Sequence, residues 1–98
     1  MHLRLVDVIE TARNNGFDVR DGRDMPVDAT MLSLVEEENL MDAPARLHFP
    51  PIDPDRDRDV VAEVSVGAQL FRIVGDVQRQ ADLRQVFEGR GRLDPETG

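Results

Sequence analysis

The sequence predicts an α+β protein, mainly β: a small antiparallel β-barrel or sandwich with an N-terminal helix. The strongest evidence is the alternation over residues 60–66, which places Val60, Ala62, Val64 and Val66 on one face and Val61, Glu63 and Ser65 on the other. A second apolar run follows the break at Gly67-Ala68, and this arrangement predicts a β-hairpin. With 98 residues, the chain is expected to form a single small domain spanning 1–98.

The N-terminal segment, residues 3–15, has helical rather than strand periodicity. Leu5, Val6, Ile9 and Ala12 form an apolar stripe at a spacing of three to four residues. Gly16 follows Asn14-Asn15 and is suited to the left-handed position that ends a helix. The next segment, Asp18 to Asp28, contains Gly, Pro and alternating charges, so we expect a loop there.

The segment from residue 30 to residue 49 fits two structures. Residues 30–37 suit either a helix capped by Asp28 or a strand that turns at Glu38-Asn39 and returns through residues 40–49. The alternation of Ala43, Ala45, Leu47 and Phe49 favours the hairpin, with Pro44 at an edge or a bulge. The β core is then expected to cover residues 30–88.

Two further segments flank the central hairpin. Pro50 to Arg58 is expected to be an exposed loop, because three of its first five residues are prolines. Residues 76–89 fit either a helix that begins at an Asp76 cap or a loop followed by a strand over Leu83–Glu88. The glycine- and arginine-containing residues 89–98 are expected to be a flexible tail.

The charge pattern limits the classes of partner. The net charge is −8, and all twelve basic residues are arginines. Binding to nucleic acid through phosphate neutralisation needs a cationic surface, so this balance disfavours it. Two explanations stay open: a surface adapted to high salt, or an acidic surface for a basic partner or for repelling DNA. The apolar run at the N-terminus contains charged residues, so we expect neither a signal peptide nor a membrane span.

No residue pattern predicts an enzyme, a metal site or a cofactor. His2 and His48 lack nearby ligands for zinc, and the absence of cysteine excludes disulfides and thiolate sites. The carboxylates of residues 36–38 are expected in an exposed turn rather than in an apolar catalytic pocket.

The acidic loop is the candidate contact site. Its charged residues are Asp53, Asp55, Arg56, Asp57, Arg58 and Asp59. An EF-hand loop beginning at Asp53 would need glycine and a bidentate carboxylate where Arg58 and Val64 stand, so a calcium site is not predicted. We expect a solvated loop that meets a partner or lines a channel.

The run GAQLFRIVGDVQRQADLRQVFEGRG, residues 67–91, resembles the C-terminal half of the head-closure (stopper) proteins of long-tailed phages and archaeal tailed viruses. In that family a hairpin is followed by a short polar loop and a last strand. The matching segments here are Leu70–Asp76, Leu83–Glu88 and Gly89. The expected strand Ala45–Phe49 with its long following loop is similar to the same small barrel, in which that loop projects into a central channel.

This resemblance implies a virion structural protein that is assembled in the host cytoplasm. The subunit would form a homo-oligomeric ring, expected to be a hexamer, between the portal-adaptor complex and the tail. DNA would be only passing cargo, with no membrane involved, and the Pro50–Asp59 loop would be the gate. The rival prediction is a small acidic regulatory binding module, such as an antitoxin or a DNA mimic, that engages a basic protein.

Overall fold

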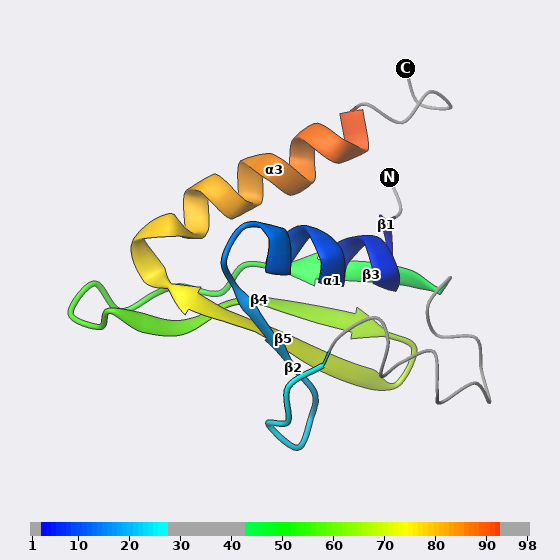
Figure 1. Cartoon of the computed structure of the whole chain (residues 1–98), viewed down its shortest axis with the longest axis horizontal. Helices are drawn as coiled ribbons and strands as arrows, with labels where there is room; N and C mark the ends of the chain where they lie inside the picture. The colour runs from blue at the N-terminus through cyan, green and yellow to red at the C-terminus, as the bar shows by residue number, and fades with distance from the viewer. Residues whose placement is uncertain (1–2, 28–42, 93–98) are drawn as a thin grey trace.

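The computed structural model describes residues 3–27 and 43–92, the last three as backbone only. It contains a curled antiparallel five-stranded sheet, or half-barrel, in the order β1-β3-β4-β5-β2, and two α-helices (Figure 1). The elements are β1 (Leu3–Arg4), α1 (Leu5–Asn14), β2 (Asp18–Arg20), β3 (Pro44–His48), β4 (Arg58–Val66), β5 (Gln69–Asp76), the 3₁₀ turn η2 (Val77–Arg79) and α3 (Gln80–Arg92). The predicted α+β, mainly β class is confirmed.

The central hairpin is confirmed as β4 and β5. These strands pair from Arg58↔Asp76 to Val66↔Gln69, and Gly67 has the positive φ of 58° that a tight hairpin turn requires. The predicted facing of Val61 is wrong, because the register shifts between Val60 and Ala62. This bulge buries Val61 and Ala62 together, although they are neighbours in sequence.

Helix α1 is confirmed, although it begins two residues later than predicted. Leu3 and Arg4 are extended and pair with Ala45 and Pro44 at the start of β3. The helix ends in a Schellman motif with Gly16 at φ 87°. In this motif the Gly16 N–H donates to the Arg13 carbonyl (3.1 Å), and the Phe17 N–H donates to the Ala12 carbonyl (3.0 Å).

The predicted loop over residues 18–28 is wrong for its first three residues. Asp18–Arg20 form β2, which pairs with β5 in the register Val19↔Ile73. Val19 is buried between two charged neighbours, so the segment contains only one apolar position and is too short to show alternation. Residues 18–20 are a strand because they pair with the edge of β5. Residues 21–25 do form a turn.

The C-terminal segment is helical, so the alternative of a strand over Leu83–Glu88 is wrong. The Asp76 carboxylate caps η2 by accepting a hydrogen bond from the Gln78 N–H (2.9 Å), as predicted for the helical alternative. Leu83 and Phe87, four residues apart, are both buried. Helix α3 continues to Arg92, where the sequence predicted a tail from residue 89 onward.

The alternatives for residues 30–42 fall outside the described part of the chain. The returning strand of the preferred hairpin is observed as β3, in which Pro44 occupies the first position. This position suits proline, because the first residue of a strand need not donate to the ladder.

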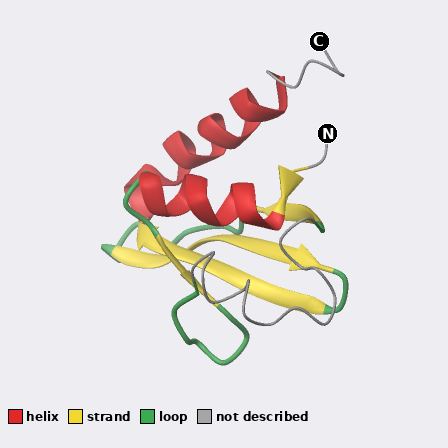
Figure 2. Ribbon diagram, turned by 45° about the vertical axis from the view of Figure 1, so that its right-hand side comes forward, coloured by secondary structure: helices red, strands yellow, loops and turns green. Residues whose placement is uncertain are grey.

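The hydrophobic core lies between the sheet and the two helices. Figures 1 and 2 show α1 and α3 on the same side of the curled sheet. The largest fully buried side chains are Leu5, Ile9, Ile73, Leu83, Val8, Val19, Val61, Val64 and Val77. The core is therefore mainly aliphatic, although Phe17, Phe71 and Phe87 are also buried in it.

Candidate functional site

The loop singled out in the sequence lies between β3 and β4, at one end of the long axis of the molecule (Figure 1). Asp53, Asp55, Arg56 and Asp57 belong to the loop and are exposed. Arg58 and Asp59 are instead the first residues of β4. The structure thus divides the predicted set between a projecting loop and a strand.

Both ends of this loop are held by the beginning of the C-terminal helical segment. The side-chain amide of Gln80 donates to the Pro50 carbonyl (2.7 Å) and to the Val61 carbonyl at the bulge (3.0 Å). The Val77 N–H donates to the Asp57 carbonyl (3.1 Å). The loop is therefore a fixed projection whose ends cannot separate without losing these bonds.

The arginines of the loop and of the first β4 position form ion pairs within the subunit, whereas the carboxylates within the loop do not. Arg56 lies 3.5 Å from Asp59, and Arg58 lies 3.1 Å from Asp18 on β2. Across the described residues, no ion pair involves Asp53, Asp55 or Asp57. The Asp53 carboxylate does accept the Asp55 N–H (2.9 Å), which shapes the turn. The tip of the loop consequently presents unneutralised negative charge.

A groove runs between β3 and the C-terminal part of α3. Its volume is about 440 Å³, and it is lined by Leu3, Ala45, Arg46, Leu47, Phe49, Arg84, Phe87 and Glu88. The groove exists because α3 diverges from α1 and the sheet toward its C-terminal end, as Figures 1 and 2 show. Apolar side chains cover most of its wall, and two arginines and one glutamate stand around it.

The two arginines of the groove differ in their contacts. The Arg84 guanidinium lies 5.8 Å from the centre of the Phe49 ring and 3.1 Å from the Glu88 carboxylate. Arg46, on β3, is exposed and has no ion pair or side-chain hydrogen bond among the described residues. Arg46 is paired with Ser65 and projects, like His48, to the sheet face away from the helices, so the groove offers mainly apolar contact area beside the Arg84–Glu88 ion pair.

The sheet face opposite the helices carries a row of charged residues. Pairing places His48 opposite Glu63 and Glu63 opposite Arg72, and Arg72 is opposite Arg20. His48 lies 3.9 Å from Glu63. Residues opposite one another on adjacent strands project to the same face, so three basic side chains and one acid form this row.

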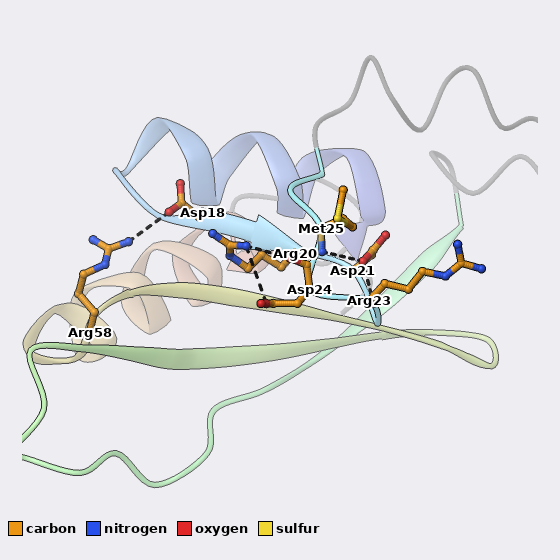
Figure 3. A network of polar contacts seen from close by, with 7 residues as sticks. All are labelled: Asp18, Arg20, Asp21, Arg23, Asp24, Met25 and Arg58. Atoms are coloured by element: carbon orange, nitrogen blue, oxygen red, sulfur yellow. Dashed lines mark hydrogen bonds and ion pairs between the residues drawn. The ribbon is translucent and has the colours of Figure 1, made fainter.

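The turn after β2 is a compact polar network (Figure 3). The Asp21 carboxylate accepts the N–H groups of Arg23 (2.8 Å) and Met25 (3.0 Å), and Arg20 donates to the Asp24 carbonyl (2.9 Å). The two bonds from Met25 and Arg23 lower the pKa of Asp21 below its ordinary value of 3.8. These hydrogen bonds are sufficient to account for the shape of the turn, so its geometry does not point to a bound ligand.

The described residues contain no group of three or more His, Cys, Asp or Glu side chains placed to hold a metal ion. Across the same residues, no helix has the length and apolar character needed to cross a membrane. Comparison with family models, with curated proteins and with solved structures finds no match for this chain.

Sequence reasoning found the loop and missed the groove. The groove combines residues from β1, from β3 and the residue that follows it, and from α3, and these extend from Leu3 to Glu88 along the chain. Only the four-residue spacing of Arg84 and Glu88 was visible as a helical pair. That pattern alone gives no reason to place Phe49 beside it.

Proposed function

We propose that this protein is a non-catalytic structural subunit that assembles into a homo-oligomeric ring, as a head-tail connector of the head-closure type in a tailed virus. The observation that carries the proposal is the presence of two different exposed surfaces at separate places on the subunit: the fixed acidic loop and the apolar groove. Two unlike surfaces that bind each other generate a head-to-tail contact, which closes into a ring when the rotation is suitable.

The connector assignment rests on the resemblance of the central hairpin and of β3 with its following loop. The part of the resemblance that required a last strand is lost, because those residues form α3. A helix at this place is still compatible with a ring subunit, since it provides one wall of the groove. In such a ring the adjacent portal-adaptor and tail proteins would be the partners, and DNA would be passing cargo.

Mass measurement tests this proposal directly. Light scattering and sedimentation of the purified chain in low salt and in molar salt should give an oligomer, and negative-stain images should show rings. Molar salt is included because the charge of −8 on each subunit opposes association when it is unscreened. A protein that stays monomeric over the whole concentration range in both salts would exclude the ring.

A second candidate is an acidic binding module for a basic protein. It is favoured by the carboxylates of Asp53, Asp55 and Asp57, which have no ion pairs among the described residues. Titration with a polyarginine peptide should then show one-to-one, salt-sensitive binding to a monomer. The triple change to asparagine at these positions should weaken that binding, whereas Asp82→Asn on the exposed side of α3 should leave it unchanged.

A further inference from the structure

We propose that the sheet face away from the two helices binds the acidic Pro50–Asp57 loop of a neighbouring copy of this chain. This inference rests on the proposed self-assembly and specifies where the loop of one copy meets the next copy. The receptor is the part of β3 and β4 where Arg46 and Ser65 stand beside a surface hollow.

Strand pairing places Arg46 on this face. Arg46 pairs with Ser65, and Ser65 pairs with Leu70, so these side chains form one row across β3, β4 and β5. Val64 and Phe71, their neighbours in sequence, are buried in the core that the helices cover. Successive side chains of a strand point to opposite faces, so the row of Arg46 is directed away from the helices. All three of its members are exposed.

A hollow of about 430 Å³ lies at this row. Its lining, among the described residues, consists of Pro44, Arg46, Ser65 and Gly67. These residues supply guanidinium and hydroxyl donors and no carboxylate, and an arginine pairs most strongly with a carboxylate that it can contact through two nitrogens. Leu70, which is 37% exposed, adds apolar surface next to Ser65. The hollow therefore suits a carboxylate carried on a partly apolar segment.

The next row on the same face is also rich in arginine. It contains His48, Glu63, Arg72 and Arg20 in order across the sheet. Glu63 lies 3.9 Å from His48, and Arg20 lies 3.9 Å from Asp24. Arg72 has no ion pair within residues 3–27 and 43–92. On a chain with a net charge of −8, these two rows form a surface with more arginines than carboxylates.

The acidic loop carries the complementary charge. Asp53, Asp55 and Asp57 are exposed, and none has an ion pair in the part of the chain that the structure describes. The bonds from Gln80 and Val77 hold both ends of the loop, which reduces the ordering needed on binding. Pairing these carboxylates with the arginine-rich face favours one specific contact over the mutual repulsion of two acidic chains.

The loop does not reach this site in its own subunit. It leads into β4 at Arg58, and Ser65 follows seven residues later on the same strand, roughly 23 Å away. The loop is also attached to the η2–α3 segment, which lies on the helix side of the sheet. Figure 1 shows the loop at one end of the molecule and the turn between β4 and β5 toward the other. The contact is consequently between copies and head-to-tail.

Cysteine cross-linking tests the contact, because the chain contains no cysteine of its own. The variants Ser65→Cys and Pro54→Cys leave Arg46 and the loop carboxylates in place. They are mixed and treated with a short bis-maleimide. We expect a dimer containing one copy of each, at a yield several-fold above that of either variant alone. The matched control mixes Arg13→Cys, at an exposed position of α1, with Pro54→Cys. Equal yields in the two mixtures would overturn the proposal.

The groove beside α3 is the competing receptor for the loop. A third mixture, Arg84→Cys with Pro54→Cys, places the reactive group at that groove. We expect a lower yield than with Ser65→Cys, because Arg84 is already paired with Glu88. A higher yield would mean that the loop lies in the groove, and the proposed contact would be wrong.

Charge exchange gives an independent readout, measured in low salt where ionic contacts are least screened. Arg46→Glu and Asp55→Arg should each weaken association about tenfold, because each places like charges together. Combining both changes in one chain should restore association to within about threefold of the original. Arg13→Glu makes the same change in charge outside the face and should have little effect. Loss without recovery in the double variant would contradict the pairing of residues 46 and 55.

The outcomes separate this proposal from the proposed function. If the unmodified chain is monomeric in both salts, the ring and the contact are both wrong. If it assembles, but the cross-linking yields are equal and Arg46→Glu associates normally, the ring stands and the contact is wrong. If Arg46→Glu weakens assembly and Asp55→Arg does not, another acidic segment occupies the face, and the contact is again wrong.

Discussion

Two arginines of the C-terminal helical segment lie over phenylalanine rings, and their surroundings differ. The Arg79 guanidinium is 5.0 Å from the centre of the Phe17 ring and donates to the Asn15 carbonyl (2.7 Å) at the end of α1. The Arg84 guanidinium is 5.8 Å from the centre of the Phe49 ring, and 61% of its side chain is exposed. Phe17 is buried, whereas Phe49 is only half-buried.

The difference shows which end of the helical segment is fixed and which is left open. At Arg79, the 3₁₀ turn is joined to the end of α1 by a hydrogen bond and a ring contact, and the Phe17 ring in turn lies close to Gly75 of β5. At Arg84, one turn and a half further on, only an exposed ion pair and a longer ring contact are present. The contacts at Arg79 fix the position of the helical segment, whereas the fewer contacts at Arg84 leave a groove beside α3.

The largest predicted effect is at Gly75→Ala. A Cβ atom at this position would overlap the Phe17 ring, so either the ring or β5 must move. We expect a loss of about 2–3 kcal/mol of unfolding free energy, as for overpacking in a core. Urea denaturation measures it. Gly89→Ala in α3 is the matched control: nothing lies near its Cβ, and it should be neutral or stabilising. Equal effects at both glycines would contradict the packing described for Phe17.

Arg79→Ala should have the next largest effect. It removes the hydrogen bond to the last turn of α1 and a cation–π contact, which together should cost about 1–2 kcal/mol. Arg84→Ala loses only exposed contacts and should cost less than about 0.5 kcal/mol. Thermal or urea unfolding of the two variants compares them directly, and an equal loss would mean that the two junctions are equivalent.

Gln80→Ala should cost about 1 kcal/mol and loosen the loop. The carbonyls of Pro50 and Val61 would lose their donor, although water can reach the partly exposed loop end. Amide hydrogen exchange around residues 52–58 should rise with this variant. Gln85→Ala, at an exposed position of the same helix, should change neither stability nor exchange. Unchanged exchange in Gln80→Ala would show that the loop is not held by this side chain.

The smallest effect concerns Asp21, which stabilises its turn only when ionised. Its folded pKa lies below its ordinary value because the Met25 and Arg23 N–H groups donate to it. The contribution is therefore present above the unfolded pKa and is lost as the pH falls through the folded pKa. A carbon-detected NMR titration should give a midpoint below 3.8. Asp21→Asn should reduce the pH dependence of the Met25 amide signal, and an unshifted midpoint would contradict the observed geometry.

The local patterns predicted the elements that carry their own signals. The hairpin of β4 and β5 followed from alternation and a two-residue break, and the end of α1 followed from Gly16. In both cases the glycine has the positive φ that the turn requires. Asp76 likewise predicted a helix start, although Leu83–Glu88 also fitted a strand. That ambiguity arose because two buried residues, Leu83 and Phe87, are too few to establish a period.

Other features depended on neighbours distant in sequence. Val61 faces the core because of a bulge, and Asp18–Arg20 is a strand because β5 offers it an edge. Neither outcome is encoded in the local pattern of apolar residues. The acidic loop was predicted by its prolines and charges, but its attachment to Gln80 was not.

The sequence by itself determined the α+β class, the central hairpin, the first helix and the exposed acidic loop. These depend on periodicity, turn residues and prolines, which act over a few positions. Only the tertiary structure decided that Arg79 is held against the end of α1 while Arg84 makes exposed contacts, and that a groove opens beside β3. The physical reason is that the shape and charge of the groove depend on how β1, β3 and α3 are placed relative to one another. Local propensities act over a few neighbouring residues and carry no information about that placement.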